Sequence, residues 1–339
     1  MTEPGIRIGV IGGGAWGTAL AAAIARAGRA VTLWARDGDT VRAINARREN
    51  PRYLPDVRLP EGLRATRDLA EAARADAVLL VVPAQATRET AAALAPHLAP
   101  GAPVVLCAKG IERHTGLFLS EVLAETLPRL NPAALSGPSF AADVARGLPT
   151  AVTLACRDAA LGRRLSETIG HASFRPYLST DLLGVEIGGA VKNVLAIAAG
   201  IAAGRELGPS AEAALVARGF AEMGRFAAAL GARRETLAGL SGLGDLILTC
   251  TRPESRNRSF GFMLGRGLAP DEARRRSRGV VEGAATAPVL LAKARALGVD
   301  MPISAAVAGV LADECDVGTA IDGLLARPFR SEDEGGTER

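Results

Sequence analysis

Lysine is scarce in this chain, and the few positions where it occurs are candidates for chemistry. Three of the 40 basic residues are lysine, namely Lys109, Lys192 and Lys293, and the other 37 are arginine. The two residue types replace each other on a solvated surface, but not where a compact ammonium group must give up a proton. A lysine retained against this bias is a candidate functional residue, with chance retention as the alternative.

Lys192 has the sequence context of a proton-transfer group. It lies in a strongly apolar helical stretch and follows Gly188, Gly189 and Ala190, which leave room for a ligand close to the helix. Burial can lower the pKa of a lysine enough for it to exchange protons with a substrate. Lys109 ends an apolar strand, where open parallel sheets bind ligands. The alternatives are a structural ion pair for Lys192 and a solvated strand end for Lys109.

A glycine-rich loop between an expected strand and an expected helix indicates a dinucleotide site. Residues 6–11 run into the sequence GGGAWG, in which Gly12, Gly14 and Gly17 form the pattern GxGxxG. The first glycine permits a tight turn, the second lets backbone amides approach a pyrophosphate, and the third lets the helix pack close to the sheet. The helix N-terminus adds oriented N–H groups. A packing turn without a ligand is the alternative.

The end of the second strand bears on the choice of cofactor. NAD-selective sites often place an acidic residue there, on the ribose diol, whereas here Arg36 comes first and Asp37 follows. A guanidinium can pair with the 2′-phosphate of NADP(H) or stack on adenine. Asp37 is either a remaining diol acceptor or a helix cap. We therefore expect NADP(H) to be preferred and NAD(H) to be accepted as well.

The elements that must position these residues fall into two groups. Up to about residue 180, apolar strands alternate with helices, which predicts an α/β fold with a Rossmann-type, doubly wound, mostly parallel sheet. The strands are expected at residues 6–11, 30–35, 77–82, 103–108, 133–136 and 150–156. From residue 181 to about 327 the pattern is helical. The sequence thus predicts a dinucleotide-binding domain at 1–179, an all-α substrate domain at 180–330 and a disordered tail at 331–339.

Composition excludes several other classes of protein. The four cysteines form no CxxC pair and only three histidines are present, so we expect neither disulfides nor a metal site. No basic segment precedes the first apolar run, and the apolar stretches look too short or too interrupted by glycine to span a bilayer. The net charge of +4 is mild and gives no signal for nucleic acid. A cytoplasmic protein without membrane insertion is expected.

Seven segments together resemble the bacterial NAD(P)-dependent glycerol-3-phosphate dehydrogenases. They read GGGAWGTAL, AKGIE, SGPSFA, GGAVKNV, GLGDLILTCT, SRNR and VVEG, in the order and at the spacing of that family. The resemblance extends from Ile8 to about Ile303 and is far more specific than the glycine-rich loop alone. It implies a Rossmann domain followed by a helical domain, usually in a homodimer. One departure is Ala15, where the family often has serine.

The resemblance implies a catalytic group of four residues. Lys192 would be the proton donor and acceptor at C2 of the substrate, and Lys109 a second cation beside substrate and cofactor. Asp245 would orient Lys192, and Asn193 would bond a substrate hydroxyl. Helix capping for Asp245 and helix packing for Asn193 are the alternatives. Thr249, one helical turn after Asp245, would add a hydroxyl on the same face.

Further residues are implied to bind phosphate or cofactor. Arg256 and Asn257 resemble the family's phosphate anchor, because a guanidinium can hold phosphate oxygens bidentately; a surface loop is the alternative. The implied substrate group comprises Lys109, Gly137, Ser139, Lys192, Asp245, Thr249, Ser255, Arg256 and Asn257. The implied cofactor group comprises Gly12, Gly14, Ala15, Trp16, Gly17, Arg36, Lys109, Ala141, Arg256, Val280 and Glu282. For Glu282, a helix cap or a solvated carboxylate is the alternative.

The implied reaction is the reduction of dihydroxyacetone phosphate to sn-glycerol 3-phosphate by hydride transfer from NAD(P)H, which would supply glycerophospholipid synthesis. One alternative is a related dehydrogenase of the same architecture that acts on a 2-keto or 3-hydroxy acid. It would carry a carboxylate anchor, whereas this chain has SRNR with GLGD. Another is a catalytically silent NADPH-binding regulator, which would lack Lys192 or Asp245.

Overall fold

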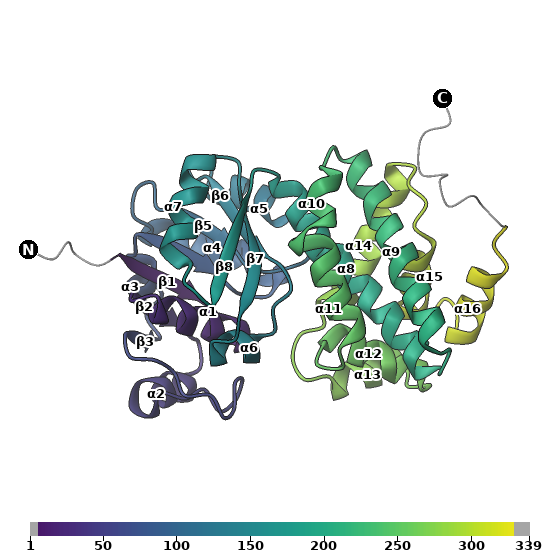
Figure 1. Ribbon diagram of the computed structural model, residues 1–339, viewed down its shortest axis with the longest axis horizontal. Coiled ribbons are helices and arrows are strands. Elements are labelled where there is room, and N and C mark those ends of the chain that lie inside the picture. Colours follow the sequence, from purple (N-terminus) through teal and green to yellow (C-terminus); the bar gives the residue numbers. More distant parts are fainter. Residues whose placement is uncertain (1–5, 329–339) are drawn as a thin grey trace, which may run out of the picture. The chain divides into compact units, whose positions relative to one another are not determined.

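The computed structural model describes residues 6–328, which form two compact units (Figure 1). The first unit contains the chain up to Lys109 together with Leu117–Glu186, and the second contains Gly110–Gly116 and the chain from Ile187 onward. The division falls inside a helix, a little beyond the boundary at residue 179 that the sequence pattern favours. The tail expected at residues 331–339 lies outside the described residues.

The first unit is built on a single eight-stranded sheet. Its strands are β1 (Arg7–Ile11), β2 (Ala30–Trp34), β3 (Leu63–Thr66), β4 (Ala77–Leu80), β5 (Val104–Leu106), β6 (Pro132–Ser136), β7 (Thr150–Cys156) and β8 (Phe174–Ser179). The order across the sheet is β3-β2-β1-β4-β5-β6-β7-β8. Neighbouring strands are parallel except β6 and β7. The predicted doubly wound, mostly parallel sheet is confirmed.

Helices connect these strands. They are α1 (Ala15–Arg26), α2 (Gly38–Arg47), α3 (Leu69–Ala73), α4 (Thr87–Leu94), α5 (Leu119–Thr126), α6 (Ala141–Arg146) and α7 (Ala159–Ile169), with 3₁₀ turns η1 (Ala84–Ala86) and η2 (Ala95–His97). The crossovers follow from the parallel pairing, because a parallel neighbour cannot be reached by a tight hairpin.

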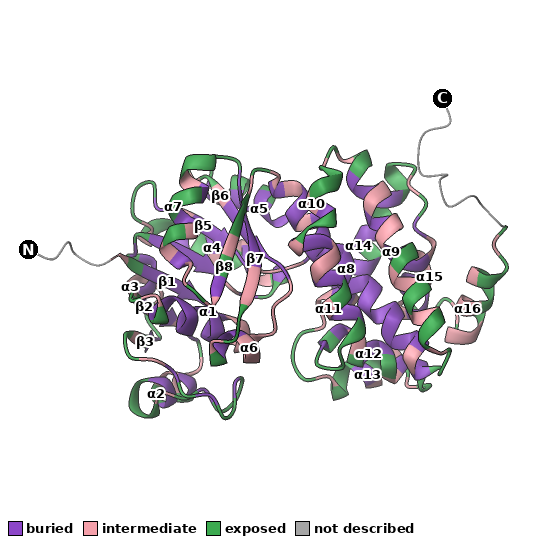
Figure 2. Ribbon diagram, in the orientation of Figure 1, coloured by how far each residue is buried: buried purple, intermediate pink, exposed green. Residues whose placement is uncertain are grey.

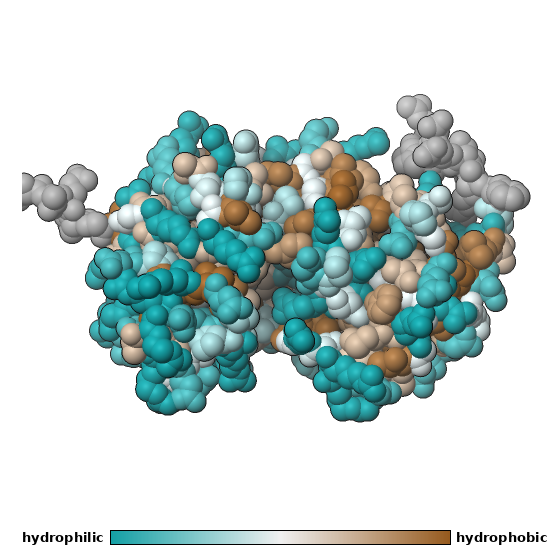
Figure 3. Space-filling model, turned by 60° about the horizontal axis from the view of Figure 1, so that its bottom comes forward, coloured by the Kyte–Doolittle hydropathy of each residue, from teal (hydrophilic) through white to brown (hydrophobic). Residues whose placement is uncertain are grey.

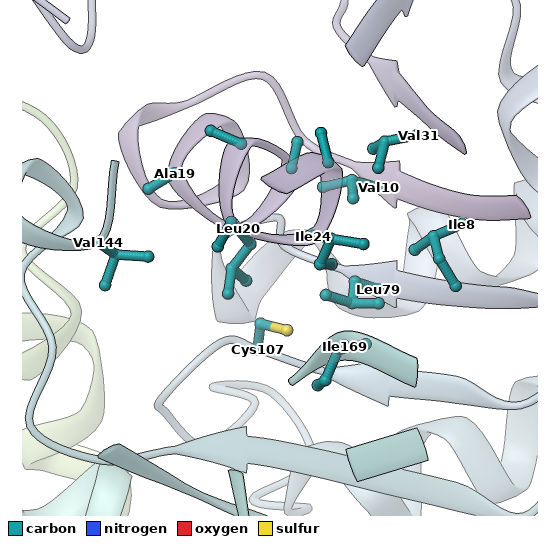
Figure 4. Packing of buried hydrophobic residues seen from close by; sticks show 14 of the residues in the cluster. Ile8, Val10, Ala19, Leu20, Ile24, Val31, Leu79, Cys107, Val144 and Ile169 are labelled. Carbon is teal, nitrogen blue, oxygen red and sulfur yellow. The ribbon is translucent and has the colours of Figure 1, made fainter. Parts of the chain in front are cut away.

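Alternation along the strands distributes apolar side chains between two cores. In β4, Ala77 and Leu79 belong to one apolar cluster, whereas Val78 and Leu80 belong to the other. Figure 4 shows Leu79 in the first cluster beside Ile24 of α1. Because both faces of the sheet are covered, its central strands must be apolar at nearly every position, as the sequence shows.

Within the described residues, the regular elements of the second unit are all helical. It contains α8 (Leu182–Gly204), whose first turn belongs to the first unit, and α9 (Pro209–Ala229), α10 (Arg234–Ala238), the π-helical turn η3 (Leu240–Gly244), α11 (Asp245–Thr251), α12 (Arg256–Gly265), α13 (Pro270–Arg276), α14 (Glu282–Ala296), α15 (Pro302–Leu311) and α16 (Val317–Leu325). The predicted all-α domain is confirmed.

Helix α8 is the core helix of the second unit. By length and composition it could cross a membrane, contrary to the expectation that the apolar stretches are too short or too interrupted by glycine. However, 89% of its most apolar window is buried inside the structure, and Figure 2 shows it as mostly buried. The visible surface of both units is instead largely hydrophilic, with smaller hydrophobic patches (Figure 3). The apolar composition of α8 is therefore explained by packing within the protein.

Candidate active site

The glycine-rich loop follows β1, and its glycines occupy positions where a side chain would be strained or would clash. Gly12 has a φ of +131°, a conformation that side chains disfavour, and its N–H donates to the Trp34 carbonyl at 3.1 Å. At Gly17 a Cβ would lie 1.8 Å from the Gly12 carbonyl oxygen, so only glycine fits. A Cβ at Gly14 would meet nothing within 4 Å. Gly14 therefore faces open space at the start of α1, where no side chain caps the first N–H groups.

Ala15 and Trp16 continue from this loop into α1. Both pack partly against the apolar cluster on that face of the sheet. Ala15 is the first residue of the helix, so its backbone N–H belongs to the first turn even though it offers no hydroxyl. Loss of the family's serine at this position leaves the backbone donors in place.

Asn50, which is remote from the glycine-rich loop in the sequence, holds the loop by direct hydrogen bonds. The sequence did not predict this role. Its amide Nδ2 donates to the Gly13 carbonyl at 3.0 Å and to Thr18 Oγ1 at 2.7 Å, and the residue is fully buried. Asn50 is one of only five asparagines, and this scarcity is the one signal that points to it. The spacing carries none, because the bonded partners lie more than thirty residues earlier in the chain.

Asp37, which follows β2, has the role of a helix cap that the sequence left open. Asp37 caps α2: its Oδ1 accepts from the Asp39 N–H at 3.0 Å, and its Oδ2 accepts from Thr40 Oγ1 at 3.0 Å and Arg52 Nη1 at 3.1 Å. These hydrogen bonds, led by that from Asp39, lower the pKa of the Asp37 carboxyl. Arg36, immediately before it, is exposed.

Lys109, Gly137 and Ser139 come together at the edge of the sheet where its parallel strands end. Lys109 Nζ donates to the Gly137 carbonyl at 3.0 Å, and Ser139 Oγ donates to the same oxygen at 3.1 Å. Lys109 follows β5 and Gly137 follows β6, two neighbouring strands in the sheet that also carries the glycine-rich loop. Ala141 begins α6 nearby and packs partly against the core. Ligands of open parallel sheets bind at this edge.

Lys192 lies in a buried polar cluster with Asp245 and Thr249. Its Nζ donates to Asp245 Oδ1 at 3.0 Å and to Thr249 Oγ1 at 2.8 Å, and Thr249 Oγ1 donates to Asp245 Oδ1 at 3.2 Å. The Lys192 and Asp245 side chains are 9% and 2% exposed. A buried ion pair of this kind contributes little net stability, because removing both charges from water costs about as much as their attraction returns. Its presence is therefore better explained by chemistry than by folding.

Close packing of α8 against η3 places Asp245 beside Lys192. The Gly244 N–H donates to the Gly239 carbonyl at 3.1 Å, which makes the π-helical turn that precedes Asp245. A Cβ at Gly188 would lie 2.6 Å from the Ser241 carbonyl oxygen in that turn. The space at Gly188, which the sequence suggested was left for a ligand, is thus filled by backbone. π-Helical turns are frequent at functional sites.

A second buried polar cluster involves Asn193 and Asn257. Asn257 Nδ2 donates to Asn193 Oδ1 at 2.8 Å, and Asn257 Oδ1 accepts from the Gly283 N–H at 2.9 Å. These bonds connect α8, α12 and α14. The Asn257 side chain is thus engaged through both its amide nitrogen and its amide oxygen, and its backbone N–H lies in the first turn of α12.

The N-terminus of α12 carries the predicted phosphate anchor. Ser255 caps the helix, its Oγ accepting from the Arg258 N–H at 3.2 Å. Arg256 is exposed at the first position, and its Nη1 lies 3.4 Å from where a Cβ on Gly279 would stand. Val280 is exposed directly after this glycine, and Glu282 begins α14. Gly279, the residue before the predicted Val280, therefore lies close to the Arg256 guanidinium.

Cysteine chemistry plays no part in this arrangement. Burial raises the pKa of Cys250, next to Thr249 in the chain, to about 12, so the thiol stays protonated at neutral pH. In residues 6–328 no group of three or more His, Cys, Asp or Glu side chains is placed to hold a metal ion. The candidate chemistry rests on the lysines, the carboxylate and the amides.

Comparison with known proteins identifies the family. The family description "NAD-dependent glycerol-3-phosphate dehydrogenase N-terminus" matches residues 7–162, and the corresponding C-terminus matches residues 181–322. The chain is 60% identical over 325 residues to the glycerol-3-phosphate dehydrogenase [NAD(P)+] of Afipia carboxidovorans, covering 96% of this chain and 98% of the relative. It is 56% identical over 325 residues to that of Maricaulis maris, with the same shares covered.

Solved structures agree with this match. The glycerol-3-phosphate dehydrogenase of Coxiella burnetii is 40% identical, with a TM-score of 0.91 over 95% of this chain and 99% of that one. A ketopantoate reductase from Ralstonia eutropha, 20% identical with a TM-score of 0.60 over 93% of this chain and all of the other, shares the fold alone. The resemblance seen in the seven motifs is confirmed, and the chain belongs to the family of NAD-dependent glycerol-3-phosphate dehydrogenases.

Proposed function

We propose that this protein is an NAD(P)-dependent sn-glycerol-3-phosphate dehydrogenase, which reduces dihydroxyacetone phosphate to sn-glycerol 3-phosphate. The observation that carries the proposal is the buried cluster of Lys192, Asp245 and Thr249 in a chain of this family. In this cluster the Asp245 carboxylate holds the Lys192 ammonium, which can act as a proton donor. Reduction of a carbonyl group by hydride requires such a donor.

The residues after β1 would hold the cofactor. The open space at Gly14 and the uncapped N-terminus of α1 fit a pyrophosphate, which backbone N–H groups and the helix dipole would bind. Bound NAD(P)H supplies the hydride that C2 of the substrate accepts. Trp16, Ala141, Val280 and Glu282 would contact the cofactor elsewhere, an assignment that rests on the family.

Lys192 would supply the proton. As hydride reaches C2, negative charge develops on the carbonyl oxygen, and the Lys192 ammonium gives that oxygen a proton. Asp245 and Thr249 hold Nζ in one orientation, so the proton is aimed before the reaction begins. Lys109 would add positive potential beside the same oxygen. In the oxidation of glycerol 3-phosphate, the same lysine would take the proton back.

Arg256 would anchor the phosphate far from the reacting carbon. Its exposed guanidinium can bind two phosphate oxygens at once, and the first-turn N–H groups of α12, including that of Asn257, would bind a third. Gly137 and Ser139 would contact the substrate near Lys109. Asn193, held by Asn257, would donate to a substrate hydroxyl.

Three finer points complete the proposal. NADP(H) would be preferred because Arg36, and not an acidic residue, directly follows the stretch predicted as the second strand. The protein would work in the cytoplasm, with its product entering glycerophospholipid synthesis. It would be a homodimer, which is supported by α16: this helix is rich in apolar residues, none is buried in the single chain, and Leu325 is 80% exposed.

The substrate assignment is tested by following NADPH oxidation with three carbonyl compounds. Dihydroxyacetone phosphate should be reduced, whereas dihydroxyacetone, which lacks the phosphate, and oxaloacetate, a 2-keto acid, should be poor substrates. A preference for oxaloacetate would favour the related class of dehydrogenases that act on keto acids. Absence of turnover with any of the three, despite NADPH binding, would favour a regulator.

A further inference from the structure

The segment after α2 reaches back to the carboxylate that ends β2. Arg52 Nη1 bonds Asp37 Oδ2 at 3.1 Å, across fifteen residues of sequence. The Arg52 guanidinium also lies over the Tyr53 ring, 5.2 Å from its centroid. The Arg52 and Asp37 side chains are 66% and 34% exposed, so this ion pair contributes little to stability.

Asp37 occupies the position that decides between the two dinucleotides in Rossmann folds. It lies between β2 and α2, about 20 residues after the last glycine of the loop, where an acidic side chain normally accepts from the ribose 2′-hydroxyl of NAD. A carboxylate with uncompensated charge at this position would repel the 2′-phosphate of NADP(H). The presence of Asp37 thus opposes the preference that Arg36 favours.

The first two carboxylates after Arg36 in the sequence are each paired with an arginine. Asp37 is bonded to Arg52, and Asp39 is bonded to Arg42. The Asp37 oxygens are further engaged by the Asp39 N–H and by Thr40. A carboxylate that already accepts three hydrogen bonds, one of them from a guanidinium, is a poor acceptor for a ribose hydroxyl and a weak source of repulsion.

We propose that Arg52 is a specificity-determining residue, which cancels the charge of Asp37 and so lets the adenosine end of the site accept a 2′-phosphate. Arg36 then acts on the phosphate directly, whereas Arg52 acts through Asp37. The inference rests on the proposed use of NADP(H). Arg52 lies outside both the glycine-rich loop and the end of β2, the two segments from which cofactor specificity is usually predicted.

The test compares dissociation constants of NADPH and NADH, measured by calorimetry without substrate. Arg52→Ala should lower the preference for NADPH over NADH by roughly tenfold, corresponding to ~1.4 kcal/mol. Asn at position 37 keeps a good helix cap. The double variant with Asp37→Asn and Arg52→Ala should therefore recover the preference to within about threefold of the parent, because neither the carboxylate charge nor its partner remains. The control is Arg47→Ala, which removes an exposed charge at the end of α2, the helix that Asp37 caps. Arg47 pairs only loosely with Glu49, at 3.8 Å, so this variant should leave the cofactor preference unchanged.

Two results would overturn the inference while leaving the proposed function standing. One is an unchanged preference in Arg52→Ala when Arg36→Asp reverses the preference. The other is an equal loss in Arg52→Ala and in the double variant, which would place Arg52 on the phosphate itself. If the unmodified protein binds NADH as tightly as NADPH, the proposed cofactor preference fails, and this inference fails with it.

Discussion

At the scale of single residues, the proposed function assigns the reacting carbon to Lys192 and the phosphate to Arg256. Lys192 is buried and paired, whereas Arg256 is exposed at the start of a helix. The difference fits their proposed tasks. Proton transfer gains from a fixed, water-poor setting, and phosphate capture gains from a guanidinium that solvent-borne ligands can reach.

Replacing Arg256 by lysine tests the phosphate anchor. Lysine keeps the charge but loses the planar fork, and lost contacts to a charged group cost about 1.5–3 kcal/mol. The value of kcat/KM for dihydroxyacetone phosphate should therefore fall roughly 10- to 150-fold. Unphosphorylated dihydroxyacetone serves as the control substrate, and its slow turnover should hardly change. Equal losses on both substrates would show that Arg256 supports the fold and not the phosphate.

The sequence predicted this site unevenly, for physical reasons. Lys192, Asp245 and Thr249 could be identified because rare residue types and long motifs mark them. The bonds of Asn257 to Asn193 and Gly283, and of Asn50 to the glycine-rich loop, could not be, because they join segments that only the folded chain brings together. Arg52 could not be identified for a further reason: it is one of 37 arginines, so its residue type gives no signal.

At the scale of elements, the sequence patterns located the buried strands and missed the two edges of the sheet. The six expected strands correspond to β1, β2, β4, β5, β6 and β7. The missed strands, β3 and β8, are the outermost ones. They read LRAT and FRPYLS, because an edge strand tolerates charge and proline that a central strand cannot. Their pairing is dictated by neighbours and not by their own hydrophobic pattern.

The contact of α8 with the π-helical turn η3 can be tested with a pair of glycine variants. Gly188→Ala would push a Cβ into the Ser241 carbonyl, so it should destabilise the protein by about 1–3 kcal/mol and displace Asp245, lowering kcat. Gly224→Ala, in α9, meets nothing within 4 Å and should stabilise by about 0.5–1 kcal/mol without affecting kcat. Urea unfolding and steady-state kinetics measure both effects. A Gly188→Ala protein with the kcat of the parent would show that the contact does not position Asp245.

Near its N-terminus, helix α8 carries a carboxylate that should make stability depend on pH. Glu186 accepts from the backbone N–H of Ser120 at 2.8 Å and from its hydroxyl, at the N-terminus of α5. Burial raises the pKa of Glu186 to about 7, above its value in the unfolded chain. Between about pH 4.5 and 7 the folded protein therefore holds a proton that the unfolded protein releases. The free energy of unfolding should fall as pH rises through this window and level off above it.

The control for this effect is Glu186→Gln, which keeps the hydrogen-bonding shape but cannot ionise. Denaturant titrations from pH 4.5 to 8 should show a smaller decline in stability for this variant than for the parent. Glu167→Gln, which removes an exposed carboxylate of α7 that is not among the causes of the raised Glu186 pKa, should retain the decline of the parent. If Glu186→Gln and the parent have parallel pH profiles, the Glu186 carboxyl is already ionised across the window.

At the scale of the whole molecule, the two units would contribute different parts of the proposed reaction. The sheet unit carries the glycine-rich loop and Lys109, and the helical unit carries Lys192, Asp245 and the predicted phosphate anchor. Family membership covers both units, from residue 7 to residue 322 apart from a short connection. In the proposed reaction, a cofactor held mainly by the first unit and a proton donor in the second would act on the same substrate.

The most direct test follows NADPH oxidation with dihydroxyacetone phosphate, in the parent and in Lys192→Ala, while NADPH affinity is measured separately for both proteins. The parent should consume one NADPH for each molecule of sn-glycerol 3-phosphate formed. Lys192→Ala should lose about 10²- to 10⁴-fold in kcat, the usual contribution of general acid catalysis, with NADPH affinity nearly unchanged. A variant that keeps more than about a tenth of the parent kcat would contradict the role of Lys192 as proton donor, since that loss is smaller than such catalysis supplies.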